Sequence, residues 1–305
     1  MLEKYKPHIA IFLANALYGA NYTIAKFVMP EYMQPSAFIL VRISGALAIY
    51  FMLQFFIKTE KVEKKDLMRL FWCGIFGVAI NQLMFFEGLN KTIAINASLI
   101  MITTPIIVLV FSAFFLSEKL QWYKILGMVL GLIGAFFIVG GKELNFSTST
   151  AKGDFLIFIN AVSYAIFLIM VKPLMQKYEP LTVIKWVFFF GFIPVYFISF
   201  KAFNQTDFSV FTAQTWWSVI FVVLGATVLA YLLNIYGLSK VNPSIVGVYI
   251  YLQPILAILF AWLLKNEMNL TLEKALAGIL IFAGVYLVSF GKNHFEKAKK
   301  LKLEN

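Results

Sequence analysis

The sequence predicts an all-α integral membrane protein with ten transmembrane helices arranged as two inverted five-helix repeats. Three observations predict it: an apolar composition, ten long apolar runs, and a motif that recurs in both halves. Of the 305 residues, 61% are hydrophobic and 13% charged, whereas a soluble protein carries about 45–50% and about 25%. A water-exposed surface needs more polar residues than this chain has, so its apolar surface must face lipid. The composition excludes a soluble enzyme, a nucleic-acid-binding domain and a disordered protein.

The predicted spans are apolar runs of about 20 residues, the length that crosses the hydrocarbon core as a helix. In chain order they are 8–28, 37–57, 68–89, 94–115, 122–141, 154–173, 181–201, 216–238, 243–264 and 272–291. The first run is too long for a cleaved signal peptide, and no small-residue cleavage site precedes the second run.

Lysine and arginine predict the orientation. With the N-terminus inside, the inner segments carry 18 of these residues and the outer segments 7. This distribution predicts a multi-pass protein of the cytoplasmic (inner) membrane with both termini in the cytoplasm. The same bias accounts for the net charge of +11 without a nucleic-acid partner. The basic tail, 292–305, is then an anchor on anionic lipid or a partner-binding segment.

A motif repeats between the two halves of the chain. FFEGLNKTIAINASLIMITTP (85–105) aligns without a gap on NIYGLSKVNPSIVGVYIYLQP (234–254) at an offset of 149 residues, so that Pro105 falls on Pro254. Each half then holds five spans, and an odd number makes the second half enter the membrane from the opposite side. We therefore predict a first repeat over 1–146, an inverted second repeat over 147–291 and a cytoplasmic tail, an architecture that serves alternating access.

These segments resemble the EamA family of the drug/metabolite transporter superfamily. The resemblance lies in GL-x-K-T-x-x-x-NASLI-x-x-x-x-P (88–105), S-E-K-L (117–120), G-x-x-x-G-x-x-G (127–134) and Tyr-Gly-Ala-Asn (18–21). It implies a ten-helix transporter that moves small organic metabolites, commonly outward, with some members exporting amino acids. Tyr18 stands where the family more often has tryptophan, and Glu87 is an unusual acid before the Gly-Leu pair.

Two prolines near the centres of equivalent spans indicate where a substrate site lies. Pro105 and Pro254 free the carbonyls of Met101 and Ile250, which need another partner in lipid. Thr103, Thr104 and Gln253 stand beside the prolines and join them as candidate site residues. The two readings are a helix kink supported by threonine packing and a substrate site built at paired interruptions.

Further polar residues near the middle of spans are candidates for lining a central cavity. They are Asn15, Tyr18, Tyr22, Asn81, Gln82, Asn160, Tyr164, Tyr231 and Tyr249. An unpaired amide in hydrocarbon costs about 2–7 kcal/mol, so each must find a partner. Hydrogen bonding between helices is the alternative to a cavity for each of them.

Four charged residues within spans are candidates for gating or coupling. Lys26 and Lys172 lie at equivalent places near opposite membrane faces, where they either snorkel to the headgroups or reach a substrate carboxylate. Arg42 lies deep enough that it should face protein or a water-filled cleft. Glu87 either pairs with Lys91 one turn later or acts as a proton- or cation-sensing acid.

The sequence contains no group of residues that we expect to form an enzyme active site. It has no phosphate-binding loop, its two histidines lie at the chain ends, and its single cysteine is Cys73. We expect no catalysis, no cofactor and no bound metal. The leading hypothesis is a secondary transporter that exports small metabolites, amino acids first, with proton or other ion coupling open. A non-transporting scaffold and a lipid-acting membrane enzyme are the alternatives, and the stripe of Gly127, Gly131 and Gly134 is also compatible with a homodimer.

Overall fold

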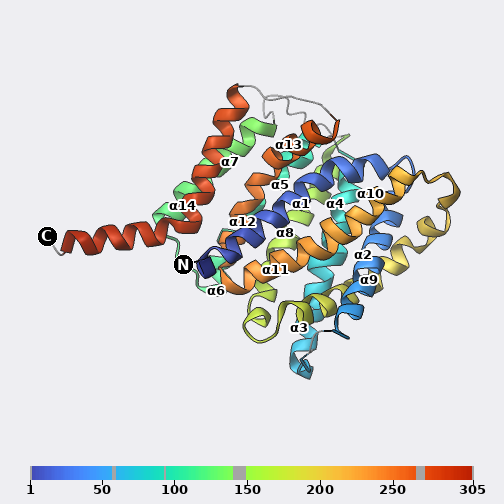
Figure 1. Ribbon diagram of the computed structural model, residues 1–305, viewed down its shortest axis with the longest axis horizontal. Coiled ribbons are helices and arrows are strands. Elements are labelled where there is room, and N and C mark those ends of the chain that lie inside the picture. Colours follow the sequence, from blue (N-terminus) through green and yellow to red (C-terminus); the bar gives the residue numbers. More distant parts are fainter. Residues whose placement is uncertain (1, 57–59, 93, 140–148, 266–271, 304–305) are drawn as a thin grey trace.

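The computed structural model describes residues 2–56, 60–92, 94–139, 149–265 and 272–303 (Figure 1). Within these ranges every regular element is a helix. The all-α membrane fold that the sequence predicts is therefore confirmed. The predicted boundary between the repeats, 146/147, lies outside the described residues.

The helices fall into two similar series. The first comprises α1 (Lys6–Val28), α2 (Pro35–Leu53), α3 (Lys64–Gly74), η2 (Ile75–Ile80), α4 (Asn81–Leu89), α5 (Ala94–Met101), α6 (Thr104–Leu116) and α7 (Trp122–Val139). The second comprises α8 (Ala151–Val171), α9 (Pro180–Asn204), α10 (Ala213–Val223), η6 (Leu224–Leu229), α11 (Ala230–Lys240), α12 (Pro243–Val248), η7 (Tyr249–Leu252), α13 (Gln253–Lys265) and α14 (Leu272–Leu303). Short 3₁₀ turns occupy Leu2–Lys4, Leu174–Gln176 and Phe208–Val210.

Nine helical segments among the described residues are long and apolar enough to cross a membrane. They coincide with the second to tenth predicted spans. The first predicted span corresponds to α1, which is 23 residues long but is not among the nine. The count of ten spans therefore stays a prediction. Large apolar side chains such as Phe114, Phe115 and Trp217 are exposed on the surface, as expected where helices face lipid.

Prolines in the first turn begin six of the helices. They are Pro7, Pro35, Pro105, Pro180, Pro243 and Pro254. A proline fits there because its fixed φ suits a helix and the first-turn N–H has no intrahelical partner. Pro105 consequently starts a new helix, α6, after a short break that follows α5.

The second half has a matching interruption at Pro254. There the 3₁₀-helix η7 separates α12 from α13, and the backbone N–H of Gln253 donates to the carbonyl of Ile250. The tighter turn thus supplies a backbone partner for the carbonyl of Ile250, which the sequence analysis expected to need another partner.

A π-helix interrupts the same span in each half. The π-helix η2 links α3 to α4, and the π-helix η6 links α10 to α11. The bounds of η2 and η6 differ by the 149 residues of the sequence repeat, and so do those of α6 and α13. Because π-helices are rare, their recurrence at one offset gives the two halves a common helical plan.

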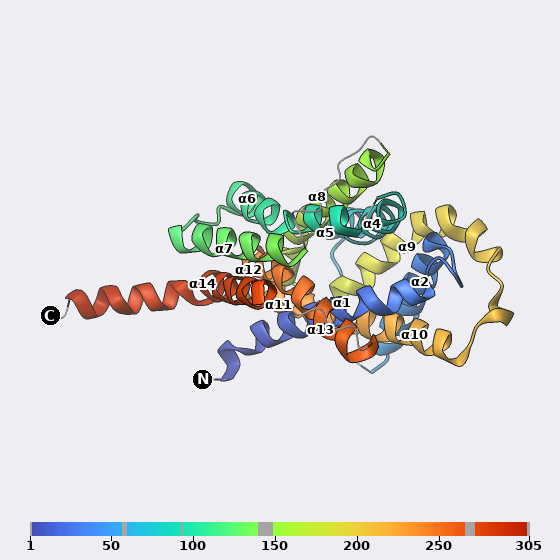
Figure 2. The same cartoon turned by 90° about the horizontal axis from the view of Figure 1, so that it is seen from above.

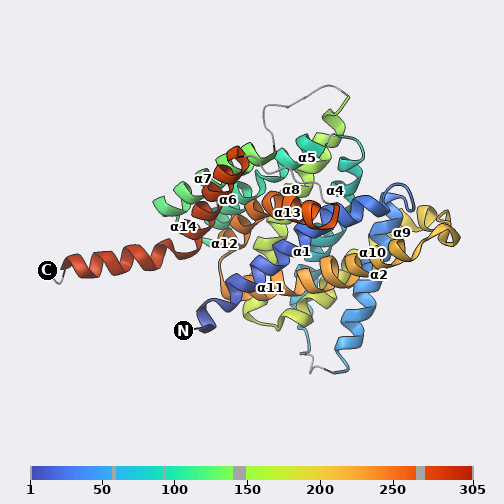
Figure 3. The ribbon, with the colours of Figure 1, turned by 45° about the horizontal axis from the view of Figure 1, so that its top comes forward.

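The packing of the helices follows the same plan. Helix α7 lies along α14, and α2 lies along α9, whereas α4 packs on α8 as α11 packs on α1. Figures 2 and 3 show α7 and α14 together at one end of the molecule and α2, α9 and α10 at the other, with α1 between them. The last part of α14 extends away from the bundle in all three views.

Candidate functional site

A cavity of about 110 Å³ lies where the two halves of the chain meet. It is lined by Tyr18, Asn21, Tyr22, Arg42, Asn81, Gln82, Phe85, Phe86, Met101, Asn160, Tyr164, Tyr231, Ile250 and Gln253. We call it the central cavity. Nine of the predicted site residues are among its lining residues, drawn from α1, α2, α4, α8, α11 and α13.

The π-helix η2 and the residue after it provide backbone acceptors for the opposite half. The amide of Asn160 donates to the carbonyl of Asn81 (2.7 Å), and the hydroxyl of Ser163 donates to the carbonyl of Phe76 (2.5 Å). Tyr231 bridges the halves as well: its hydroxyl accepts from Gln82 Nε2 (2.6 Å) and donates to the carbonyl of Gly77 (3.4 Å). These bonds position Asn160, Gln82 and Tyr231 around the central cavity.

Helices α1 and α13 meet in a second hydrogen-bonded group. Gln253 Nε2 donates to Asn15 Oδ1 (2.8 Å), and Asn15 Nδ2 donates to the carbonyl of Ile11 (2.8 Å). The hydroxyl of Tyr22 lies 3.5 Å from Gln253 Oε1. Asn15 is buried behind the lining, so it orients Gln253 and does not itself face the central cavity.

Arg42 is the charged group of the cavity wall. Its side chain is 4% exposed, and its Nε donates to Thr227 Oγ1 (3.2 Å). The rings of Phe86 and Phe38 lie 5.4 and 6.0 Å from the guanidinium carbon. In the part of the chain that the structure describes, no carboxylate forms an ion pair with Arg42.

Two amide oxygens beside the cavity have no hydrogen-bond partner among the described residues. They are Asn160 Oδ1 and Asn21 Oδ1, and both atoms are shielded from solvent. Because a buried acceptor without a partner is costly, these oxygens are candidate acceptors for a ligand or a water molecule.

A second cavity of about 440 Å³ adjoins the first and shares Asn21, Tyr22, Phe85, Phe86 and Met101 with it. Lys26 lines it, and we call it the Lys26 vestibule. Glu87 lies in neither lining, and its carboxylate pairs with Lys91 (2.5 Å) at the surface. The i,i+4 ion pair is thus formed.

Lys172 lies apart from the central cavity, in a third cavity lined also by Glu118 and Lys124. Its ammonium donates to the carbonyls of Leu238 and Val241, at 2.7 Å each. Glu118 forms a buried ion pair with Lys124 (2.5 Å). The sequence-equivalent lysines therefore differ, since Lys26 faces the vestibule whereas Lys172 ties the end of α8 to the end of α11.

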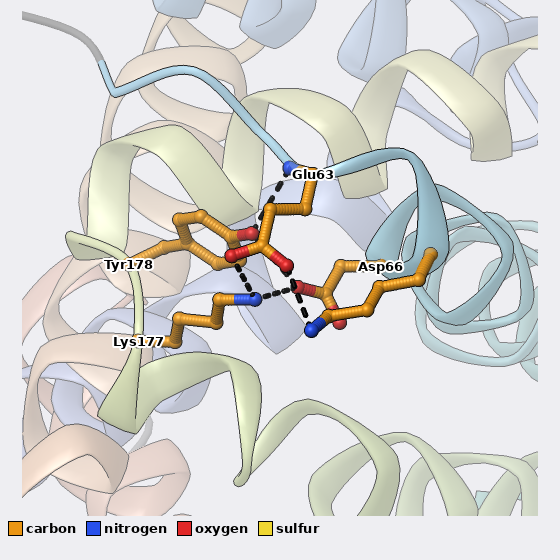
Figure 4. A network of polar contacts seen from close by, with 5 residues as sticks. Glu63, Asp66, Lys177 and Tyr178 are labelled. Atoms are coloured by element: carbon orange, nitrogen blue, oxygen red, sulfur yellow. Dashed lines mark hydrogen bonds and ion pairs between the residues drawn. The ribbon is translucent and has the colours of Figure 1, made fainter.

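A cluster of charges joins the start of α3 to the segment between α8 and α9 (Figure 4). Lys177 Nζ lies 2.6 Å from both Glu63 Oε1 and Asp66 Oδ2, and the Tyr178 hydroxyl donates to Asp66 Oδ2 (2.7 Å). The backbone N–H of Glu63 donates to the same hydroxyl (3.1 Å). We call these four residues the Lys177 clasp. Hydrogen bonds from Lys177 and Lys65 lower the pKa of Glu63, and those to Asp66 and Glu63 raise the pKa of Lys177.

Other predicted site residues lie outside the cavity lining. They are Thr103, Thr104, Pro105, Tyr249 and Pro254, together with Asn15. Thr103 donates to the carbonyl of Ile100 (2.6 Å), and Tyr249 bonds to His8 (3.0 Å). The prolines shape the site indirectly, because Met101 and Ile250, four residues before them, line the cavity.

The sequence analysis missed three lining residues, Asn21, Phe85 and Phe86. Helical periodicity was an available signal. Phe85 and Phe86 follow Asn81 and Gln82 by four residues, and Asn21 follows Tyr18 by three, so each shares a face with a predicted residue.

The sequence of this chain is similar to those of known transporters. Residues 6–140 and 151–290 each match the EamA-like transporter family. The uncharacterized transporter YoaV of Bacillus subtilis is 27% identical over 252 residues, covering 81% of this chain and 84% of the relative. An uncharacterized transporter of Archaeoglobus fulgidus is 27% identical over 283 residues, covering 93% and 98%.

More distant similarity extends to plants and to a solved structure. The protein WALLS ARE THIN 1 of Arabidopsis thaliana is 22% identical over 336 residues, covering 97% of this chain and 85% of the relative. A protein of known crystal structure superposes with a TM-score of 0.78 at 17% identity, covering 95% of this chain and 98% of that one. At that identity the structural match shows the fold alone.

Proposed function

This chain belongs to the EamA-like transporter family of the drug/metabolite transporter superfamily, and we propose that it exports small organic metabolites, amino acids first among them. It is a multi-pass membrane transporter. The finer proposal is secondary transport by alternating access across the cytoplasmic membrane, with both termini in the cytoplasm.

The observation that carries this proposal is the central cavity at the meeting of the two halves. Its lining combines amides, hydroxyls, aromatic rings and one guanidinium within an apolar bundle. A small concave site with a few convergent polar groups is typical of a ligand site. Amides and hydroxyls suit a polar organic solute better than an inorganic ion.

The recurring helical plan supports an inverted repeat around that cavity. Gln82 bonds to Tyr231, which is its own equivalent at the 149-residue offset. Residues that are equivalent in two repeats meet one another on a two-fold axis relating those repeats. A cavity on such an axis is the expected location of a site that is exposed to each side in turn.

The differing closure of the two ends supports alternating access. At one end the Lys26 vestibule continues from the central cavity. At the other, the Lys177 clasp joins the first half to the second. By the lysine distribution the vestibule lies on the outer side and the clasp on the inner side.

Reconstitution into proteoliposomes tests the proposal with a matched pair of variants. Gln253 and Thr104 are equivalent in the repeat, but only Gln253 lines the cavity. We expect Gln253→Ala to lower amino-acid flux about tenfold, since a lost buried hydrogen bond costs about 1–3 kcal/mol. Thr104→Val should transport normally. Wild-type vesicles that move no amino acid would contradict amino-acid export, and equal flux from both variants would remove the cavity from the transport path.

A further inference from the structure

Arg42 is a buried cation whose counter-charge is absent from the described protein, and the proposal that follows rests on the transport function above. We propose that Arg42 binds the carboxylate of the transported solute while the amide oxygens of Asn21 and Asn160 accept hydrogen bonds from its ammonium group. The central cavity would then recognise the zwitterionic core of an amino acid through two separate subsites.

The environment of Arg42 leaves its charge uncompensated. A buried guanidinium in an apolar bundle needs an anion or several hydrogen bonds. Its one hydrogen bond to the described residues joins Nε to a neutral threonine. Glu87, the acid nearest in sequence to the lining residues of α4, is engaged by Lys91. Among the residues that the structure describes, this positive site therefore has no acid paired with it.

The geometry of the guanidinium suits a carboxylate. With Nε bonded to Thr227, the two terminal nitrogens remain for the pair of oxygens of one carboxylate, which is the bidentate arrangement that arginine favours. The ring centroids of Phe86 and Phe38 lie 5.4 and 6.0 Å from the guanidinium carbon, within the range of a cation–π interaction. A lysine at this position would offer the charge without the fork.

The amide oxygens complete the recognition from the acceptor side. Asn160 is 2% exposed, and its Nδ2 is fixed on the carbonyl of Asn81, so its unpartnered group is the oxygen. Asn21 contributes a second unpartnered oxygen from α1. An ammonium group carries three donors and no acceptor, which matches two neutral oxygens that have nothing to accept.

Charge balance favours a zwitterion over the singly charged alternatives. A solute with only an ammonium would bring a second positive charge beside Arg42, and Coulomb repulsion in this interior would oppose its binding. A solute with only a carboxylate would neutralise Arg42 but leave both amide oxygens without donors. The zwitterion satisfies all three side chains.

The test measures exchange of a ¹⁴C-labelled mixture of neutral amino acids in proteoliposomes. Its competitors are leucine, isopentylamine, which lacks the carboxylate, and 4-methylpentanoate, which lacks the ammonium. For the wild type we expect leucine to compete at least about tenfold better than either analogue, equivalent to about 1.4 kcal/mol. Equal competition by leucine and isopentylamine would overturn the carboxylate subsite.

Variants separate the two subsites. Arg42→Gln should raise the leucine concentration needed for half-inhibition about tenfold and abolish the preference for leucine over isopentylamine. Asn21→Leu should abolish the preference for leucine over 4-methylpentanoate. Arg69→Gln, which changes the exposed second arginine of the chain, should leave both preferences unchanged.

Folding and the proposed function are distinguished within the same experiment. Should Arg42→Gln fail to insert, Arg42→Lys keeps the charge and should still weaken competition by leucine severalfold, because the fork is lost. If either variant inserts and still exchanges amino acids with wild-type affinity, the proposed role of Arg42 is wrong but the proposed amino-acid export stands. Wild-type vesicles without amino-acid exchange overturn the proposed amino-acid export instead.

Discussion

The amide of Asn15 bonds at both ends, to the carbonyl of Ile11 through Nδ2 and to Gln253 Nε2 through Oδ1. It is 2% exposed, so neither bond competes freely with water. Gln253 comes from α13, more than two hundred residues away in the sequence, and its orientation in the cavity depends on this partner.

We expect a double-mutant cycle to find coupling between these two residues. Asn15→Ala should lower the free energy of unfolding by about 1–3 kcal/mol, because it leaves Gln253 Nε2 without its acceptor. Combining it with Gln253→Ala should cost less than the sum of the single changes, by about 0.5–3 kcal/mol. Denaturant unfolding in detergent measures this, with Thr104→Val as the control that should add independently, because the Thr104 hydroxyl bonds to neither residue. Strict additivity for Asn15 and Gln253 would contradict the coupling.

Sequence reasoning identified most of the residues near the site but not what each one does. Asn15 and Tyr18 look alike as midspan polar residues, yet Asn15 bonds behind the wall whereas Tyr18 lines the cavity. The difference depends on which helix packs against each face of α1, and that is a long-range property. Lys26 and Lys172 are equivalent in the sequence but not in their surroundings, since Lys172 donates to carbonyls at the end of α11 whereas Lys26 lines the vestibule.

Among the helices, the pair α7 and α14 depends most on residue size. A Cβ on Gly127 would lie 2.7 Å from the carbonyl oxygen of Gly284, and one on Gly284 would lie 2.8 Å from the backbone nitrogen of Gly131. The stripe of Gly127, Gly131 and Gly134 therefore seats helices of this same chain, as small-residue faces commonly do.

Alanine substitutions at two glycines of α14 should have opposite effects. Gly284→Ala should destabilise the protein by about 1–3 kcal/mol, because backbone of α7 blocks the added methyl group. At Gly278 the nearest side-chain atom to an added Cβ is 3.7 Å away, on Ile255. Gly278→Ala should therefore be neutral or stabilise by up to about 1 kcal/mol, through helix propensity. Thermal unfolding followed by size-exclusion chromatography measures both, and equal loss at the two positions would argue against the close approach.

The elements differ in how well the sequence predicts them. Apolar runs place nine helical segments within a few residues, because span length is fixed by the bilayer. The π-helices η2 and η6 were not predicted, since neither segment contains a residue type that demands the wider turn. Carbonyls of η2 accept hydrogen bonds from Ser163 and Tyr231, and carbonyls of η6 accept from the Tyr50 hydroxyl, so tertiary contacts across the halves accompany the local geometry.

At the scale of the whole molecule, the charges of the Lys177 clasp set the pH range over which it stays closed. The pKa of Glu63 is lowered, so the stability that its ion pair gives to the closed clasp is present above the ordinary carboxyl pKa. That stability is lost as pH falls through the lowered value. The pKa of Lys177 is raised, so the stability that its ammonium gives to the closed clasp is lost only as pH rises through that higher value. We therefore expect the clasp to stay closed between about pH 5.5 and 9. The ratio of inner-side to outer-side labelling of a cysteine in the central cavity, from which the ionisation of the thiol itself cancels, should be constant over that range. A midpoint inside this window would assign the closure to other groups.

Opening the clasp should change which side of the membrane reaches the central cavity. In a Cys73→Ser background, Asn21→Cys gives one reporter thiol at a residue shared by the central cavity and the Lys26 vestibule. A membrane-impermeant maleimide should label it faster from the outer side, in right-side-out vesicles, than from the inner side, in inverted ones.

Lys177→Glu replaces two ion pairs by repulsion from Glu63 and Asp66, and labelling from the inner side should rise severalfold. Adding Asp66→Lys restores an opposite-charge pair and should reverse that rise, which distinguishes opening from misfolding. Inner-side labelling that stays constant in all three proteins would mean that the clasp does not close the path.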